Sequence, residues 1–448
     1  MESLQSRVLS SLFFLFQETQ NKDDANLIAI LGQLFSYCLT KGWETYKPVS
    51  ALIQNNNNNN DGFLTSLTRK ISMACHDFVS MSRITSSSSE IITKMATCKV
   101  LQKCILQENK YNTSKTNLVE CLFASIKTSV DRTKSDVNEG KKTRKGIMEA
   151  LLALSALHDM RNCFGSACHS IQVLLALSNS SKSELDITRE IALIIMVNLA
   201  SSSQVIDSTY DFGRNIIVCN GLDILMTLCC NNPRESLGIK RRASTLLSRL
   251  VISSKEILEK GRRKMIWTEF SNITSHNNWM SSTEQTIAES TVSIADNLLR
   301  IYISSVEKRY QYEEVDVNVI MELLPKPRKN SSGEIDRYSV CQSPEVAPKD
   351  SAMSFASMKS STFHANLLKL LIHYTDSDQS HIHILIESKA IETLVCLLAN
   401  SSNYHNAITK NASLVLARLV KGSDLAKQRC RDIRGLEILV ELGKTGRI

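Results

Sequence analysis

Few residues of this chain have the types and spacing that catalysis requires. The segment Gly443-Lys444-Thr445 contains the Gly-Lys-Thr of a phosphate-binding loop. Such a loop needs a glycine five positions before Gly443, where this chain has Ile438, and it needs a strand before it and a helix after it. The sequence also has no G-x-S-x-G, H-E-x-x-H or G-x-G-x-x-G motif. We therefore expect a protein that is not an enzyme.

The cysteines and histidines give no metal-binding pattern. The 13 cysteines are scattered and are never spaced as C-x-x-C. Cys163 and the Cys168-His169 pair have no second pair of ligands at zinc spacing. His381 and His383 are two positions apart, which on a helix points them to different faces. We expect no metal and no other cofactor, and we expect the thiols to be free and buried, as in a reducing compartment.

Residues that could act by binding lie in short helical segments that recur along the chain. Segments 239–251 (IKRRASTLLSRLV) and 408–420 (ITKNASLVLARLV) are identical at seven of thirteen positions. Their apolar residues fall at i, i+4, i+7, i+8, i+11 and i+12, which is the stripe of an amphipathic helix. Segments 188–200 and 290–299 follow the pattern less closely, and Thr188 replaces the first apolar residue. Any buried helix has this period, so the stripe alone leaves the fold open.

A second element at a constant distance indicates a repeat. The segments that begin at Gly221 and Ala390 share the order small residue, aliphatic residue, acid, any residue, Leu. Each precedes the central alanine of its helix, Ala243 or Ala412, by the same 22 positions. A third copy begins at Gly435, and we expect that last repeat to be truncated. Two helices in units of about 40 to 50 residues are typical of armadillo and HEAT repeats.

These paired segments resemble the second and third helices of armadillo repeats, with short first helices expected in 211–219 and 377–388. The resemblance implies an all-α fold, a right-handed superhelical solenoid of stacked two- and three-helix repeats. The low aromatic content of 6% and the 6 prolines agree with a helical chain. Importin-like repeats carry a Trp four residues before their Asn. The residue four positions before Asn411 is Ala407, which argues against a receptor for nuclear localisation signals.

The chain is expected to have four parts. The segment 304–362 contains four of the six prolines and a candidate phosphorylation site at Ser343. No apolar run is long enough to span a membrane, and the opening segment VLSSLFFLF is too short. The parts are an N-terminal helical region (1–140) with a disordered Asn-rich loop (54–61), central repeats (141–303), a flexible Pro- and Ser-rich insertion (304–362) and C-terminal repeats (363–448).

The resemblance also indicates where a partner would bind. In armadillo stacks the third helices line a concave groove, where an Asn contacts the backbone of a bound chain. The residues expected on this polar line are Asn198, Arg242, Arg249, Asn297, Asn411 and Arg418. The arginines favour acidic client segments. In the alternative interpretation, Arg249 and Arg418 only pair with neighbouring carboxylates.

We expect a cytoplasmic, non-catalytic scaffold that binds protein clients with acidic or extended segments, away from membranes. The formal net charge of +8 leaves a second hypothesis open. The basic runs 141–145, 240–242 and 262–264 could belong to a nuclear or nucleic-acid-associated factor, although no RNA-binding signature accompanies them.

The segment from Lys410 to Leu439 carries a further resemblance. Its ends, KNASLVLARLV and RCRDIRGLEIL, are similar to the C-terminal armadillo region of a TPR-plus-armadillo family of motile cilia, the tetratricopeptide repeat protein twelve family. That family helps to preassemble axonemal dynein arms with chaperones in the cytoplasm. The resemblance therefore implies chaperones and dynein-arm subunits as partners. Since the TPR unit of that family is not in this sequence, it also implies a truncated gene model, an isoform or a divergent relative.

Overall fold

The computed structural model is helical throughout the part of the chain that it describes, and no strand occurs in that part. Before residue 118 it describes only isolated residues and short runs, so most of the region expected over 1–140, with its loop at 54–61, lies outside the described residues. The main described ranges are 118–131, 137–157, 169–180, 185–200, 212–231, 234–254, 259–275, 285–305, 315–324, 353–377, 379–401 and 404–446.

The chain forms two compact units, an N-terminal unit (Met1–Leu228) and a C-terminal unit (Cys229–Ile448). Their boundary falls inside the stretch 141–303 that the sequence suggests as one block of repeats. The described helices of the N-terminal unit are α7 (Leu118–Asp131), α8 (Val137–Ala156), α10 (Ser170–Asn179), α11 (Asp186–Ala200), α12 (Phe212–Val218) and α13 (Gly221–Met226), and a π-helix, η5 (Thr227–Asn231), contains the boundary.

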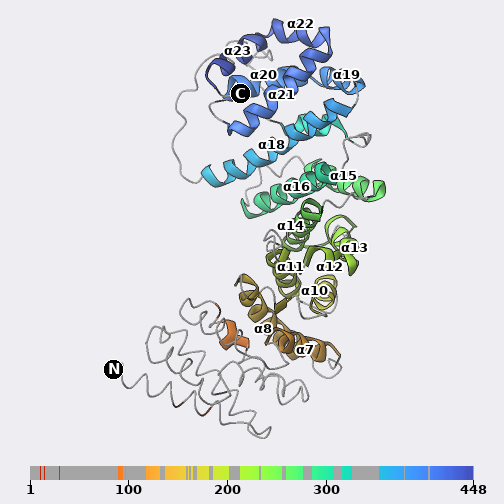
Figure 1. The fold of residues 1–448 in the computed structure, drawn as a ribbon, viewed down its shortest axis with the longest axis vertical. Helices are drawn as coiled ribbons and strands as arrows, with labels where there is room; N and C mark the ends of the chain where they lie inside the picture. The colour runs from red at the N-terminus through yellow and green to blue at the C-terminus, as the bar shows by residue number, and fades with distance from the viewer. Residues whose placement is uncertain are drawn as a thin grey trace, which may run out of the picture. The chain divides into compact units, whose positions relative to one another are not determined.

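The C-terminal unit is also all helical where it is described. Its helices are α14 (Leu237–Ser254), α15 (Lys260–Ser275), α16 (Gln285–Ser305), α17 (Val317–Leu323), α18 (Met353–Ser377), α19 (Ser380–Glu387), α20 (Ala390–Ala399), α21 (Asn406–Gly422), α22 (Asp424–Asp432) and α23 (Gly435–Lys444). Four of them, α14, α16, α18 and α21, pack against one another in chain order (Figure 1). We call these four the layered helices. Shorter helices, such as α20 against α21, pack beside them.

The apolar stripes predicted from the sequence hold the layered helices in place. All six stripe residues of α14, from Ile239 to Val251, have no exposed surface. In α21 the stripe from Ile408 to Leu419 is buried, and only its last residue, Val420, is half-buried. Removing such surface from water contributes roughly 1.5–3 kcal/mol for each large aliphatic side chain. The two short first helices are confirmed as α12 and α19.

A left-handed residue links each first helix to its second helix. Asn220, Lys389 and Arg434 have φ angles of 56°, 61° and 59°, and each directly precedes α13, α20 or α23. The residue that follows must be small. A Cβ on Gly435 would lie 2.6 Å from the Cys430 sulfur and 2.7 Å from Val395 Cγ2. The small residue that opens the repeated sequence motif is therefore explained by a close approach at this junction.

The expectation of a flexible insertion over 304–362 differs from the structure at α17. Val317, Ile320 and Met321 recur with helical spacing and are buried. Asp316 caps the helix, because its side chain accepts a hydrogen bond from the Asn318 amide at 2.9 Å. The prolines of this segment favour a loop, whereas its short apolar stripe favours the helix that is observed. The helix α18 also begins inside 304–362, at Met353.

A histidine links α18 to α17. His364 is buried and forms a hydrogen bond with the backbone of Leu323. Burial lowers the pKa of His364 from 6.5 to about 4, and the hydrogen bond only partly opposes this shift. The imidazole is therefore neutral at physiological pH.

None of the described helices is both long and apolar enough to cross a membrane.

Candidate partner-binding face

Five of the six residues predicted to line the groove lie on layered helices of the C-terminal unit. Arg242 and Arg249 are on α14, Asn297 is on α16, and Asn411 and Arg418 are on α21. Asn198 is on α11 in the N-terminal unit. Most of them contact a neighbouring helix as well as, or instead of, facing solvent, so each contact bears on what is left to bind a partner.

Asn297 binds the preceding layered helix through its side-chain amide. Its Nδ2 donates to the Ser244 hydroxyl at 3.2 Å and to the Thr245 hydroxyl at 3.0 Å. Both hydroxyls in turn donate to the carbonyl of Arg241 in their own helix. Since Asn297 is buried, each of these bonds contributes on the order of 1 kcal/mol to stability. We infer that Asn297 fixes α16 on α14.

The same arrangement occurs in the N-terminal unit. Asn198 on α11 donates from Nδ2 to the Ser155 hydroxyl on α8 at 3.0 Å. Ser155 donates to the carbonyl of Leu152 in its own helix at 2.8 Å. In both units, an asparagine thus bridges to a hydroxyl on an earlier helix that packs against its own.

The helix α18 makes a similar contact with α16 through Asn366, which is not among the six residues predicted from the sequence. Asn366 donates from Nδ2 to Asp296 Oδ1 on α16 at 2.7 Å. Burial raises the pKa of Asp296, while the bond from Asn366 and the nearby Arg300 act in the opposite direction. The signal was present in the sequence, because Asn366 precedes Asn411 by the same 45 positions that separate Lys389 from Arg434.

The helix α21 donates to α18 at two points. Asn411 Nδ2 donates to the carbonyl of Ala365 at 2.9 Å. Arg418 donates from Nη1 to the carbonyl of Ile372, and the same Nη1 lies 2.8 Å from Asp376 Oδ2. The side chain of Arg418 is 29% exposed, against 55% for Asp376. For Arg418 the structure therefore has the carboxylate pairing that the alternative interpretation described.

These contacts share one direction along the chain. In each of them the later helix supplies the donor, an Asn or an Arg, and the earlier helix supplies the acceptor. We call them the directional contacts. The asparagine amides that the resemblance assigns to a bound client are thus engaged within the fold, and a client on this face would need other side chains.

Cations remain on the exposed side of the layered helices. Arg249 on α14, Arg300 on α16 and Lys369 on α18 are all exposed. Among the described residues Lys369 takes part in no ion pair, and Arg300 interacts only with the largely buried Asp296. Arg242 is half-buried. We call Arg249, Arg300 and Lys369 the cationic row.

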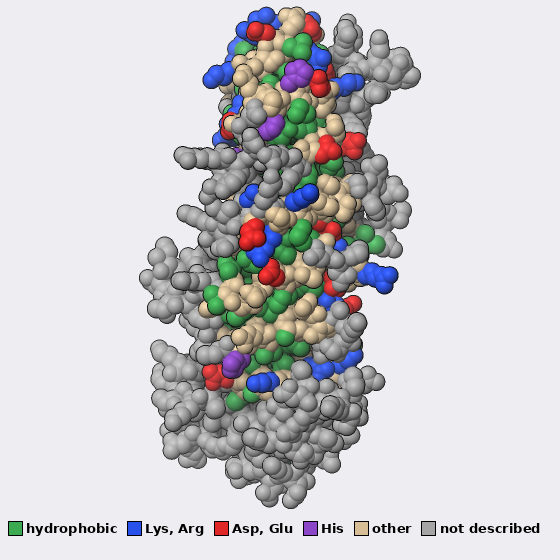
Figure 2. All heavy atoms as spheres, turned by 90° about the vertical axis from the view of Figure 1, so that its right-hand side faces the viewer, with side chains coloured by type: hydrophobic (Ala, Val, Ile, Leu, Met, Phe, Trp, Pro, Cys, Tyr) green, Lys and Arg blue, Asp and Glu red, His purple; other side chains and the backbone are tan. Residues whose placement is uncertain are grey.

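The basic runs are partly used inside the fold. Lys240 is buried, and its Nζ lies 2.7 Å from Glu269 Oε1 on α15. Arg144 and Arg263 are buried as well. On the face drawn in Figure 2, basic side chains are interspersed with acidic and apolar ones and do not form one large basic patch. Three cations of the basic runs are therefore buried and not available to bind phosphates.

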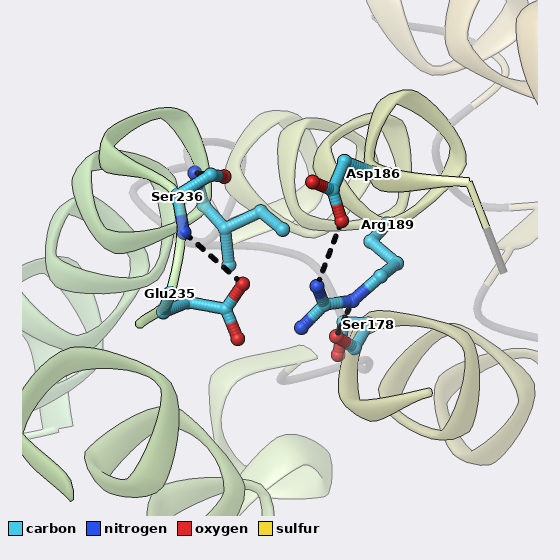
Figure 3. Close-up of polar contacts among 6 residues, drawn as sticks. Ser178, Asp186, Arg189, Glu235 and Ser236 are labelled. Carbon is cyan, nitrogen blue, oxygen red and sulfur yellow. Dashed lines mark hydrogen bonds and ion pairs between the residues drawn. The ribbon is translucent and has the colours of Figure 1, made fainter. Parts of the chain in front are cut away.

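Another buried cation, Arg189, holds two helices of the N-terminal unit together. The Arg189 Nε on α11 donates to the carbonyl of Ser178 on α10 at 3.0 Å, and its Nη1 donates to Asp186 Oδ1 at 3.0 Å (Figure 3). Since Arg189 is only 2% exposed, its contacts are structural.

Figure 3 also shows a contact of the C-terminal unit, just before α14. There the Ser236 amide donates to Glu235 Oε1 at 3.3 Å.

Of the two regions that raised the question of a metal, Cys168 of the first lies outside the described residues, and both histidines of the second have other contacts. The described cysteines are free thiols, and no group of three metal-ligating side chains occurs among the described residues. Burial, and to a smaller extent Glu269, raise the pKa of Cys230 to about 12, while Lys240 acts in the opposite direction. On α19, His381 Nδ1 lies 2.9 Å from the Tyr374 carbonyl, and His383 pairs with Glu387.

No protein-family model matches the sequence, and no curated protein matches it. Among solved structures, an engineered protein from a structural genomics consortium covers 97% of this chain over 94% of its own length, at 14% identity and a TM-score of 0.49. SYS-1 covers 92% of this chain over 80% of its own length, at 11% identity and a TM-score of 0.41. Likenesses at these TM-scores carry no argument about family or function.

Proposed function

We propose that this chain is a non-catalytic scaffold that binds acidic client segments on the layered helices of its C-terminal unit. We further propose that the layered helices belong to armadillo-like repeats, stacked as a right-handed superhelical solenoid. The pairing of short first helices with left-handed junctions and long stripe-bearing helices supports this architecture.

The observation that carries the proposal is the cationic row. Three exposed cations come from three successive layered helices, and two acids on those helices already have partners. Asp296 binds Asn366, and Asp376 pairs with Arg418. A partner with carboxylates can pair with Lys369 without displacing an ion pair of the described residues, and with Arg300 in addition to its interaction with Asp296.

The directional contacts contribute rigidity to this face. A surface that is fixed before binding loses less conformational entropy when a partner docks. Because the asparagine and arginine bridges hold each layered helix to the one before it, the spacing between the cations is set by packing. The directional contacts thus hold the helices in position, and the cationic row pairs with the partner.

The test neutralises the cations and measures peptide binding. We expect the Arg300→Gln, Lys369→Gln double variant to bind a fluorescent Glu/Asp-rich peptide about fivefold more weakly than the wild-type chain, since two exposed pairs of about 0.5 kcal/mol each sum to about 1 kcal/mol. The matched control is Lys264→Gln with Lys427→Gln, which removes two exposed charges from α15 and α22. Equal weakening by both variants would show that only net charge matters and would refute the cationic row.

The resemblance to the ciliary family supplies the candidate clients. We propose that the chain acts in the cytoplasm beside chaperones during preassembly of axonemal dynein arms. Quantitative mass spectrometry of pull-downs from ciliated cells tests this, with the double variant as the comparison. If dynein-arm subunits are not enriched by the wild-type chain, or are enriched equally by the variant, the ciliary assignment is wrong.

The nuclear or nucleic-acid alternative has weaker support, because its basic runs include the paired Lys240 and the buried Arg144 and Arg263. Binding to single- and double-stranded nucleic acid at rising salt separates the two. A steep fall of affinity with salt would favour the alternative.

A further inference from the structure

The cations of the cationic row share one position relative to the directional contacts. Each follows, by four positions, the residue of its own helix that accepts a hydrogen bond from an asparagine of the next layered helix. The pairs of acceptor and cation are Thr245 and Arg249 on α14, Asp296 and Arg300 on α16, and Ala365 and Lys369 on α18. Residues four apart lie on one face of a helix, one turn from each other. Each cation therefore lies one turn beyond the contact that holds the next helix.

This common position aligns the three cations across the stack. The helices α14, α16 and α18 pack on one another in chain order (Figure 1). The axes of packed helices are about 8–10 Å apart, so successive cations of the row are anchored about 9 Å apart. The only acid within four positions of a cation on its own helix is Asp296, which accepts the bond from Asn366. The row is therefore a line of positive charge with a regular spacing.

The spacing favours one backbone conformation for an extended client. In a β-strand, side chains on one face recur at every second residue, at about 6.6 Å and then about 13 Å, and neither distance matches the row. A polyproline II segment has three residues in each turn and advances about 9 Å in that turn. Its side chains at i, i+3 and i+6 therefore lie on one side with the spacing of the cations.

An α-helical client fits this surface less well. Its residues i and i+7 are about 10 Å apart on one face, but a docked amphipathic helix also needs a hydrophobic groove for its apolar side. The exposed large apolar residues described on these three helices are Leu237 on α14 and Ile287 on α16. They precede the cations of their helices by 12 and 13 positions, which is about 18–20 Å along the axis. The described surface beside the row thus offers charge without an apolar groove.

We propose that the cationic row binds a polyproline II segment of a partner protein in which Asp or Glu recurs at every third residue. One carboxylate pairs with each of Arg249, Arg300 and Lys369. This inference rests on the proposed function, because it specifies the conformation and the acid spacing of the same acidic client. A polyproline II segment is already extended before it binds, so docking costs it less conformational entropy.

The test compares peptides that differ only in the order of their residues. The spaced peptide is Glu-Pro-Pro-Glu-Pro-Pro-Glu, and the clustered peptide is Glu-Glu-Glu-Pro-Pro-Pro-Pro, so both have the same composition and charge. Binding of each fluorescent peptide to the full chain is measured by anisotropy at low ionic strength, where exposed ion pairs are screened least. We expect the spaced peptide to bind about fivefold more tightly, because the clustered acids reach one cation of the row instead of three.

A control variant moves one cation without changing the net charge. Arg300→Ser combined with Ser304→Arg shifts the cation of α16 by one turn to an exposed position, and we expect the preference for the spaced peptide to disappear. If circular dichroism shows that this variant is unfolded, Lys369→Gln takes its place and should reduce the preference to about twofold.

The outcomes separate this inference from the proposed function. If the wild-type chain binds both peptides equally and Arg300→Gln with Lys369→Gln weakens both, the acid spacing is wrong while the acidic client stands. If that double variant weakens neither peptide, both proposals fail. A cross-linked α-helical peptide with Glu at i, i+7 and i+14 tests the other conformation, and tighter binding of this peptide than of the spaced one would overturn the polyproline II client.

Discussion

Acid should destabilise the C-terminal unit through His364. Burial holds the pKa of this imidazole at about 4 in the folded chain, against 6.5 for an unperturbed histidine. Between these values the unfolded chain binds more protons than the folded chain, so the free energy of unfolding falls as the pH decreases. The stabilising contribution is fully present above pH 6.5 and is lost progressively toward pH 4.

The two pKa values set the size of the effect. At pH 5 most unfolded chains carry the proton on His364, while about a tenth of the folded chains do. The difference corresponds to about 2 kcal/mol of unfolding free energy lost between pH 8 and pH 5.

Urea unfolding followed by Trp267 fluorescence provides the assay. Trp267 is buried in the C-terminal unit and stacks on Phe270 with ring centroids 5.1 Å apart, so it reports on that unit once Trp43 and Trp279 are replaced by Phe. The control is His364→Gln, which keeps a hydrogen-bonding side chain and does not titrate. If the variant loses as much stability between pH 8 and pH 5 as the parent chain, the reasoning about His364 is refuted.

Three further outcomes follow from the contacts described above. Glu269→Gln leaves the charge of Lys240 buried without its partner and should lower the unfolding free energy by about 3 kcal/mol, whereas the paired change Glu269→Leu, Lys240→Met should cost less in the same urea titration. Lys389→Gly should raise the melting temperature, because glycine relieves about 1 kcal/mol of left-handed strain, and an unchanged or lower value would contradict that. Arg418→Glu places a carboxylate beside Asp376 and should destabilise the unit, and Asp376→Lys in the same chain should restore most of the loss if the ion pair is the cause.

The sequence predicted the elements whose signal is local. Stripes such as Ile239 to Val251 are periodic, and the small residue at Gly221 or Ala390 marks the junction between a first and a second helix, so both could be recognised without coordinates. Thr188 was expected to interrupt the apolar stripe of its helix, but it is fully buried in α11. Its hydroxyl oxygen is buried without a hydrogen-bond partner among the described residues, so its burial has no compensating polar contact.

The contacts between helices could not be predicted in the same way. Arg418 binds the Ile372 carbonyl, 46 positions away, and which carbonyl it meets depends on how far α21 is shifted along α18. Periodicity places a polar residue on the right side of its helix, but it gives neither that shift nor the acceptor. The six predicted residues were therefore found as a set of polar positions, while their division between internal bridges and exposed cations required the structure.

The directional contacts have a consequence for how such a chain can grow. Each layered helix such as α16 or α18 carries its donors toward the helix before it and its acceptors toward the helix after it, so every copied helix brings both halves of a matching joint. A tandem duplication of one unit can be inserted between existing units without new polar pairing, whereas an inverted or misphased insertion would set donors against donors. The hydrogen bonds thus tolerate a change in the number of repeats. They disfavour repeats that are inserted in reverse orientation or out of phase.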